Sequence, residues 1–133
     1  MLLNVDRLGS VLTRLLASSP LPSEGGAKVS FPKNVRVYVG HNVPGREHPH
    51  ASHFVSSTIG KAMVSCGIAG ATILPAIGVW RGANETTTVV EVVCGTQGEL
   101  DSVKRLATLL RSVLAQDAVL MVSTPAQVEL IGA

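Results

Sequence analysis

The chain has 133 residues, of which 46% are hydrophobic, 15% are charged and 3% are aromatic. This length usually gives one domain, and the apolar content is sufficient for an aliphatic core. The net charge of +2 comes without a cluster of lysine and arginine, which argues against a nucleic-acid partner. No apolar run reaches the roughly 20 residues of a membrane span, and both cysteines lie outside any CxxC pair, so we expect a cytoplasmic protein with buried thiols.

The beginning of the chain predicts a helix followed by a linker. Apolar residues at helical spacing in residues 1–18 predict an amphipathic helix that packs on its own domain or on a neighbouring subunit. Residues 19–33 hold three prolines and two glycines among several serines, a composition typical of a linker. Residues 34–133 then form the predicted domain.

The domain begins with a strand and a helix. Residues 35–39 alternate between apolar and polar side chains, which predicts a half-buried strand. Apolar residues at helical spacing predict a helix over 50–65, and Gly67 is placed to end it in a left-handed conformation. A long hairpin follows, with strands over 68–80 and 86–94 joined by a polar turn.

A second helix and further strands complete the pattern. Thr96 and Glu99 have the spacing of a capping box, which predicts that a helix starts there. Residues 117–122 predict a fourth strand that Thr124 and Pro125 break, and residues 127–131 predict a short edge strand. The order β-α-β-β-α-β predicts an α+β, ferredoxin-like fold, with two helices on one face of a four-stranded antiparallel sheet.

The face of the sheet turned away from the helices is also expected to be apolar. In the third strand, Val90, Val92 and Cys94 point one way, and Val89 and Val93 point the other way with Glu91 between them, so both faces carry apolar side chains. Exposed apolar patches of more than a few hundred Å² are rare in monomers. We therefore expect a cover on this face, either the N-terminal helix or, as the preferred alternative, other subunits.

The predicted arrangement resembles the PII-like superfamily, which includes the PII signalling proteins and the CutA proteins. The segment GVWRG at residues 78–82, followed by Glu85 and Glu91, is similar to a CutA pattern. The first strand, which ends in Val-Gly-His-Asn at residues 39–42, is similar to small uncharacterised bacterial and phage proteins. The resemblance implies a homotrimer with inward-facing sheets. The long mobile loop and the glycine-rich nucleotide loop of PII have no counterpart here, so ATP binding does not carry over.

One candidate site is the loop at residues 40–49, which leads from a strand to a helix N-terminus. Free N–H groups at such a terminus favour a bound anion. Trp80 has the position to stack on a ring while Arg81 reaches an anion; alternatively, Trp80 packs on a neighbouring subunit and Arg81 pairs with Glu85. Glu91 faces a cleft between subunits or pairs with Arg36. The predicted ligand-binding residues are His41, Asn42, Arg46, His48, Trp80, Arg81, Glu85 and Glu91.

A second candidate site uses histidine, since all four histidines of the chain lie close together in sequence. His50 and His53 share a helix face, and with His48 they form a candidate ligand set for Zn, Cu or Ni; His41 belongs to the same cluster. The alternative is a polar loop whose histidines bind no metal.

Three functions follow from these features. The first is a homotrimer that binds or sequesters a small anionic, nucleotide-like ligand in clefts between subunits. The second is a CutA-type metal-binding protein that uses the histidine cluster. The third is a structural or interaction subunit that docks through its N-terminal helix. No nucleophile or acid–base pair stands out in the sequence, which argues against an enzyme. We therefore predict no catalytic residue. The sequence does not indicate a cofactor.

Overall fold

The computed structural model describes residues 30–80 and 82–132. The elements, in chain order, are β1 (Lys33–Gly40), α2 (Ser52–Cys66), β2 (Thr72–Trp80), β3 (Ala83–Cys94), α3 (Gln97–Val113) and β4 (Leu120–Pro125). The predicted α+β class and the order β-α-β-β-α-β are confirmed. The predicted N-terminal helix over 1–18, and nearly all of the predicted linker over 19–33, lie outside the described residues.

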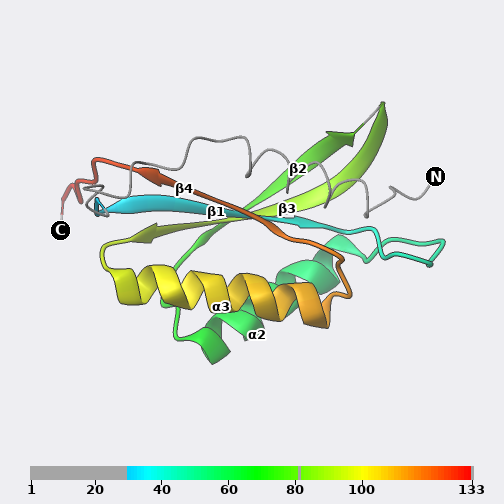
Figure 1. Ribbon diagram of the computed structural model, residues 1–133, viewed down its shortest axis with the longest axis horizontal. Coiled ribbons are helices and arrows are strands. Elements are labelled where there is room, and N and C mark those ends of the chain that lie inside the picture. Colours follow the sequence, from blue (N-terminus) through cyan, green and yellow to red (C-terminus); the bar gives the residue numbers. More distant parts are fainter. Residues whose placement is uncertain (1–29, 81, 133) are drawn as a thin grey trace, which may run out of the picture.

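The four strands form one sheet in the order β2-β3-β1-β4, with every neighbouring pair antiparallel. Both helices lie against the same face of this sheet, as Figure 1 shows. Strands β1 and β3 occupy the centre because valines on alternate positions can be buried there, as in the facing pairs Val35 with Val92 and Val37 with Val90. Ile59 from α2 and Leu106 and Leu110 from α3 complete the core over these valines.

The helix ends follow the expected local chemistry. Gly67 adopts the left-handed conformation (φ 70°) that ends α2. At the start of α3, the hydroxyl of Thr96 accepts a hydrogen bond from the backbone N–H of Glu99 at 3.2 Å. The Glu99 carboxylate accepts in turn from the backbone N–H of Gly95 at 2.9 Å, one residue before the position that a capping box uses. None of the described helices is long and apolar enough to cross a membrane.

Two strand predictions near the C-terminus are wrong. Strand β4 covers Leu120–Pro125 rather than 117–122, and Thr124 and Pro125 pair with Asn34 and Lys33 instead of breaking the strand. Proline is tolerated there because β4 is at the margin of the sheet. Residues 127–131 form no strand in the part of the chain that the structure describes. The first hairpin strand also starts later, at Thr72, because residues 68–71 connect α2 to the sheet.

The face of the sheet turned away from the helices is mixed rather than uniformly apolar. Its centre carries an ion pair, with Arg36 Nε 2.6 Å from Glu91 Oε2, and these two residues face each other across β1 and β3. Apolar side chains on the same face include Val93 and Val122, which are partly exposed.

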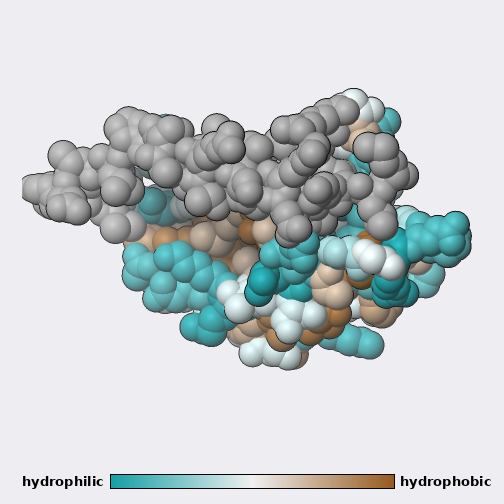
Figure 2. All heavy atoms as spheres, turned by 45° about the vertical axis from the view of Figure 1, so that its right-hand side comes forward, coloured by the Kyte–Doolittle hydropathy of each residue, from teal (hydrophilic) through white to brown (hydrophobic). Residues whose placement is uncertain are grey.

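Hydrophobic residues also reach the surface among hydrophilic ones in the layer that holds the helices (Figure 2). Val64 of α2 and Val113 of α3 are exposed.

Candidate functional site

The candidate site is centred on Glu85, a residue near the start of β3. Two glycines on the neighbouring strands lie beside Glu85. Gly78 on β2 is its register partner, and Gly40 ends β1 on the other side. A Cβ atom on Gly40 would lie 2.8 Å from the Glu85 carboxyl carbon, so the carboxylate packs directly on the Gly40 backbone. Glycine on both sides therefore leaves the Glu85 carboxylate without a neighbouring side chain at these two positions.

The Glu85 carboxylate is half-buried and holds one backbone hydrogen bond. Its Oε1 atom accepts from the N–H of Asn42 at 3.0 Å. Burial raises the pKa of the Glu85 carboxyl, and the Asn42 N–H opposes that shift. Glu85 is therefore a candidate for a binding site because its half-buried carboxylate accepts a hydrogen bond from a loop backbone N–H. Glu85 and Asn42 were both among the predicted ligand-binding residues, and the structure brings them into contact.

His41 lies beside this pair but faces the core. Its side chain is buried, and Nε2 lies 2.7 Å from the hydroxyl oxygen of Thr88. Its backbone carbonyl accepts a hydrogen bond from the N–H of His50 at 2.8 Å. Burial lowers the pKa of His41, which favours a neutral imidazole. The structure thus makes His41 an anchor for the loop that carries Asn42.

A residue that the sequence prediction missed ties the same loop to the end of α3. Gln116 Nε2 donates to the carbonyl of Asn42 at 2.9 Å and to the carbonyl of Leu114 at 3.2 Å. His50 Nε2 lies 2.9 Å from that Leu114 carbonyl. These bonds satisfy a helix-terminal carbonyl and fix the position of Asn42 over Glu85. The sequence signal was limited to a polar residue three positions after the end of α3.

The other predicted site residues in the described part of the chain form no hydrogen bond with the Glu85 carboxylate. Arg46 and His48 are exposed on the loop, and His53 is exposed on α2. Arg81 and the side chain of Trp80 lie outside the described part of the chain. Over residues 30–80 and 82–132, no three His, Cys, Asp or Glu side chains are grouped to hold a metal ion. The predicted cluster of His48, His50 and His53 is therefore not assembled in the structure.

Glu91 lies on the same face of β3 as Glu85, about six residues away, or roughly 20 Å at ~3.3 Å per residue. The alternative in which it pairs with Arg36 is confirmed. The hydrogen bond from Arg36 lowers the pKa of Glu91, and the same bond raises the pKa of Arg36. Glu91 is therefore neutralised by a partner within its own sheet.

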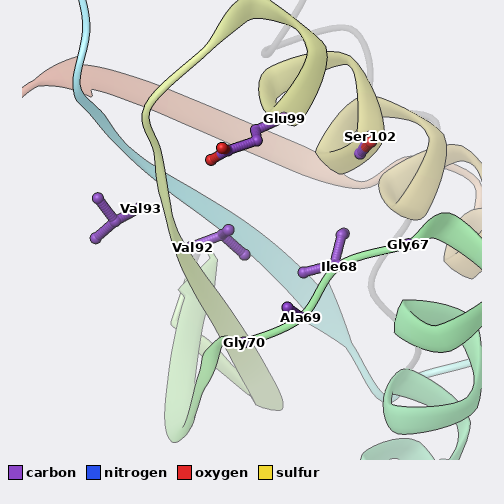
Figure 3. A pocket seen from close by; sticks show the side chains of 8 residues that line it. All are labelled: Gly67, Ile68, Ala69, Gly70, Val92, Val93, Glu99 and Ser102. Carbon is purple, nitrogen blue, oxygen red and sulfur yellow. The ribbon is translucent and has the colours of Figure 1, made fainter.

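A separate hollow of about 290 Å³ lies at the other end of β3. It is lined by Gly67, Ile68, Ala69, Gly70, Val92, Val93, Glu99 and Ser102. Figure 3 shows the Glu99 side chain reaching from α3 toward β3, with Ile68 and Val92 on either side of the space below. This volume is at the small end for ligand pockets. The sequence prediction did not identify this hollow.

Comparisons with known proteins show which solved structures have a similar fold. No family model matches the chain, and no curated protein matches its sequence. Among solved structures, the chain is similar to a phage SAM lyase in complex with S-methyl-5'-thioadenosine, with a TM-score of 0.57 and 19% identity over 77% of this chain and 88% of that chain. It is similar to a phage SAM lyase in the apo state, with a TM-score of 0.55 and 20% identity over 70% and 79%.

These matches correct the resemblance to the PII and CutA proteins. That resemblance rested on an element order and on a short segment around Trp80, and the same element order occurs here in a fold similar to SAM lyase. The functional roles predicted for this chain, namely signal sequestration, CutA-type metal binding and docking through the N-terminal helix, are overturned with it.

Proposed function

We propose that this protein binds S-adenosylmethionine and cleaves it to S-methyl-5'-thioadenosine, with Glu85 as the residue that contacts the cationic part of the substrate. The fold supports this proposal, because the similarity to the phage SAM lyase complex extends over 77% of this chain and 88% of that chain. The observation that carries it further is the half-buried Glu85 carboxylate, flanked by Gly40 and Gly78 and held by the N–H of Asn42.

The chemistry of the substrate fits this carboxylate. S-adenosylmethionine carries two cationic groups, a sulfonium and an ammonium, whereas S-methyl-5'-thioadenosine carries neither. Burial raises the pKa of Glu85, so the ionised carboxylate is unfavourable without a partner. A bound cation would be that partner and would stabilise the ionised carboxylate of Glu85. The site therefore favours the sulfonium substrate over its neutral product.

The proposed cleavage needs no proton from the protein. The bond between the sulfonium sulfur and the γ-carbon of the amino-acid moiety breaks, and its electron pair returns to sulfur. The substrate's own carboxylate oxygen forms the new bond to the γ-carbon, so the second product is homoserine lactone. Two opposite charges are lost in this step, and a site that excludes water favours such a loss. Glu85 and Asn42 would orient the substrate rather than react with it.

The test is incubation of the full chain with S-adenosylmethionine, followed by chromatographic separation of the products. We expect S-methyl-5'-thioadenosine and homoserine lactone in equal amounts. The variant Glu85→Gln should lose most of the activity, and Glu47→Gln, an exposed position on the adjacent loop, should retain it. The absence of both product formation and calorimetric binding of S-adenosylmethionine by the unmodified chain would refute the proposal.

Self-association is a further part of the proposal, with the homotrimer expected from the sequence as the assembly. It is supported by large apolar side chains that remain exposed on β2, among them Ile77 and Val79 at 71% and 67%. A strand at the margin of a sheet that exposes several apolar side chains is typical of a surface that pairs with another chain. Light scattering that gives the mass of a single chain, 13.8 kDa, would contradict it.

A further inference from the structure

The segment after β4 has the pattern of a strand but forms none in the described chain. Gln127, Val128, Glu129 and Leu130 alternate between polar and apolar side chains, and Ile131 follows. Val128, Leu130 and Ile131 are exposed at 52%, 82% and 85%. Such alternation is typical of a strand with one buried face. We call residues 126–131 the C-terminal segment.

A matching surface exists on β2. This strand is at the margin of the sheet, so one of its edges pairs with β3 and the other is free among the described residues. Ile77 and Val79 lie two residues apart on one face of β2, the same spacing as Val128 and Leu130. Side chains at this spacing on neighbouring strands pack directly against each other. The edge and the segment therefore fit as adjacent strands.

The C-terminal segment cannot reach this edge within its own chain. Pro125 pairs with Lys33, which pairs with Cys94, whereas Ile77 pairs with Thr86. The two positions are about eight residues apart along β3, or roughly 26 Å, before the width of the sheet is added. From Pro125, an extended chain reaches roughly 10 Å at Val128 and roughly 20 Å at Ile131. Figure 1 shows the segment and the turn of the β2–β3 hairpin at opposite ends of the molecule.

We propose that the C-terminal segment of one copy adds as a strand to the free edge of β2 in a second copy, with Val128 and Leu130 packed on Ile77 and Val79. A second copy is the favoured occupant because each chain carries both surfaces at opposite ends. Every chain then donates one segment and accepts one, and such head-to-tail contacts can close into a ring. This inference specifies the contact behind the self-association proposed above.

The first test is the molar mass, by light scattering, of the full chain, of three substituted variants and of one truncated chain. Leu130→Lys and Ile77→Lys each place a charge in the proposed contact, and each variant should have the mass of one chain, 13.8 kDa. Gln127→Lys places the same charge on the other side of the segment and should retain the mass of the unmodified assembly. Circular dichroism should show that all variants are folded, and a chain truncated after Ala126 should behave like Leu130→Lys.

A mixture of the two charge variants gives a sharper result. Leu130→Lys keeps an intact β2 edge, and Ile77→Lys keeps an intact C-terminal segment, so the mixture should form pairs that hold one chain of each. An unmodified chain that is a single copy in solution, a truncated chain that still assembles, or a mixture that forms no pairs would overturn the proposal. The mass is measured without S-adenosylmethionine, so it does not depend on whether the protein cleaves this substrate. The assembly proposal and the cleavage proposal can therefore fail independently.

Discussion

Glu85 and Glu91 are the same residue type on the same face of one strand, yet their surroundings differ. Glu91 is paired with Arg36 at 2.6 Å, and this bond lowers the pKa of Glu91. Glu85 has Gly40 and Gly78 beside it and accepts a hydrogen bond from a backbone N–H, and burial raises its pKa. A carboxylate whose charge is balanced inside the sheet has a structural explanation. The half-buried Glu85 carboxylate has no cationic partner among the described residues, and we propose a bound ligand as that partner.

The largest expected effect is on substrate binding. Glu85→Gln removes the charge that we propose to contact the cation, and the affinity for S-adenosylmethionine should fall by about 10-fold to 100-fold, the value of a charge-assisted hydrogen bond. Glu91→Gln is the matched control, because Glu91 is already neutralised by Arg36, and it should change the affinity by less than about twofold. Isothermal titration calorimetry measures both. Equal losses in the two variants would remove the distinction between these carboxylates.

The next effect concerns the Gly40 backbone on which Glu85 packs. Gly40→Ala would place a Cβ atom against the Glu85 carboxylate, which must move and give up its hydrogen bond to Asn42. Losing a hydrogen bond to a charged group costs about 1.5–3 kcal/mol, and urea unfolding should show a loss near the lower end because the side chain can move toward water. In a chain that already carries Glu85→Ala, Gly40→Ala should leave the free energy of unfolding almost unchanged. Gly60→Ala, where the added Cβ meets nothing, should stabilise α2 by about 1 kcal/mol.

The pH dependence of stability should have opposite signs at the two carboxylates. The raised pKa of Glu85 means that the folded chain holds its proton more tightly than the unfolded chain, so its contribution to stability is lost as pH rises through that raised pKa. The lowered pKa of Glu91 gives a contribution that is present above its unfolded pKa and is lost as pH falls through the folded value. The urea midpoint should be measured across the acid range for the unmodified chain and both variants. As pH rises, the midpoint should fall less in Glu85→Gln than in the unmodified chain. As pH falls, it should fall less in Glu91→Gln than in the unmodified chain.

The fold could be predicted from the sequence because its determinants are local. Alternate valines in β1 and β3, Gly67 after α2 and the Thr96–Glu99 spacing each act within a few residues. The limits of β4 were missed because they depend on pairing with β1, which tolerates Pro125 at the sheet margin.

The candidate site was only partly predictable because its contacts are distant in sequence. Asn42 and Glu85 were both identified, but the bond from Gln116 to Asn42 joins residues separated by 74 positions, and no local pattern indicates it. The orientation of His41 did have a signal. It continues the alternation of Val35, Val37 and Val39, so its side chain faces the core beside Thr88 rather than the open loop.

The smallest expected effect comes from Gln116, which does not touch the Glu85 carboxylate but positions its partner. Gln116→Ala removes the donor to the carbonyls of Asn42 and Leu114, and it should reduce stability by about 1 kcal/mol, the usual value of a neutral hydrogen bond. The affinity for S-adenosylmethionine should fall less than in Glu85→Gln, because the charge remains and only the loop is less firmly held. Gln116→Glu offers a comparison of similar size that cannot donate, and Gln97→Ala on the exposed start of α3 is the control. If Gln116→Ala weakens binding as much as Glu85→Gln, then loop order, and not the Glu85 carboxylate, dominates recognition.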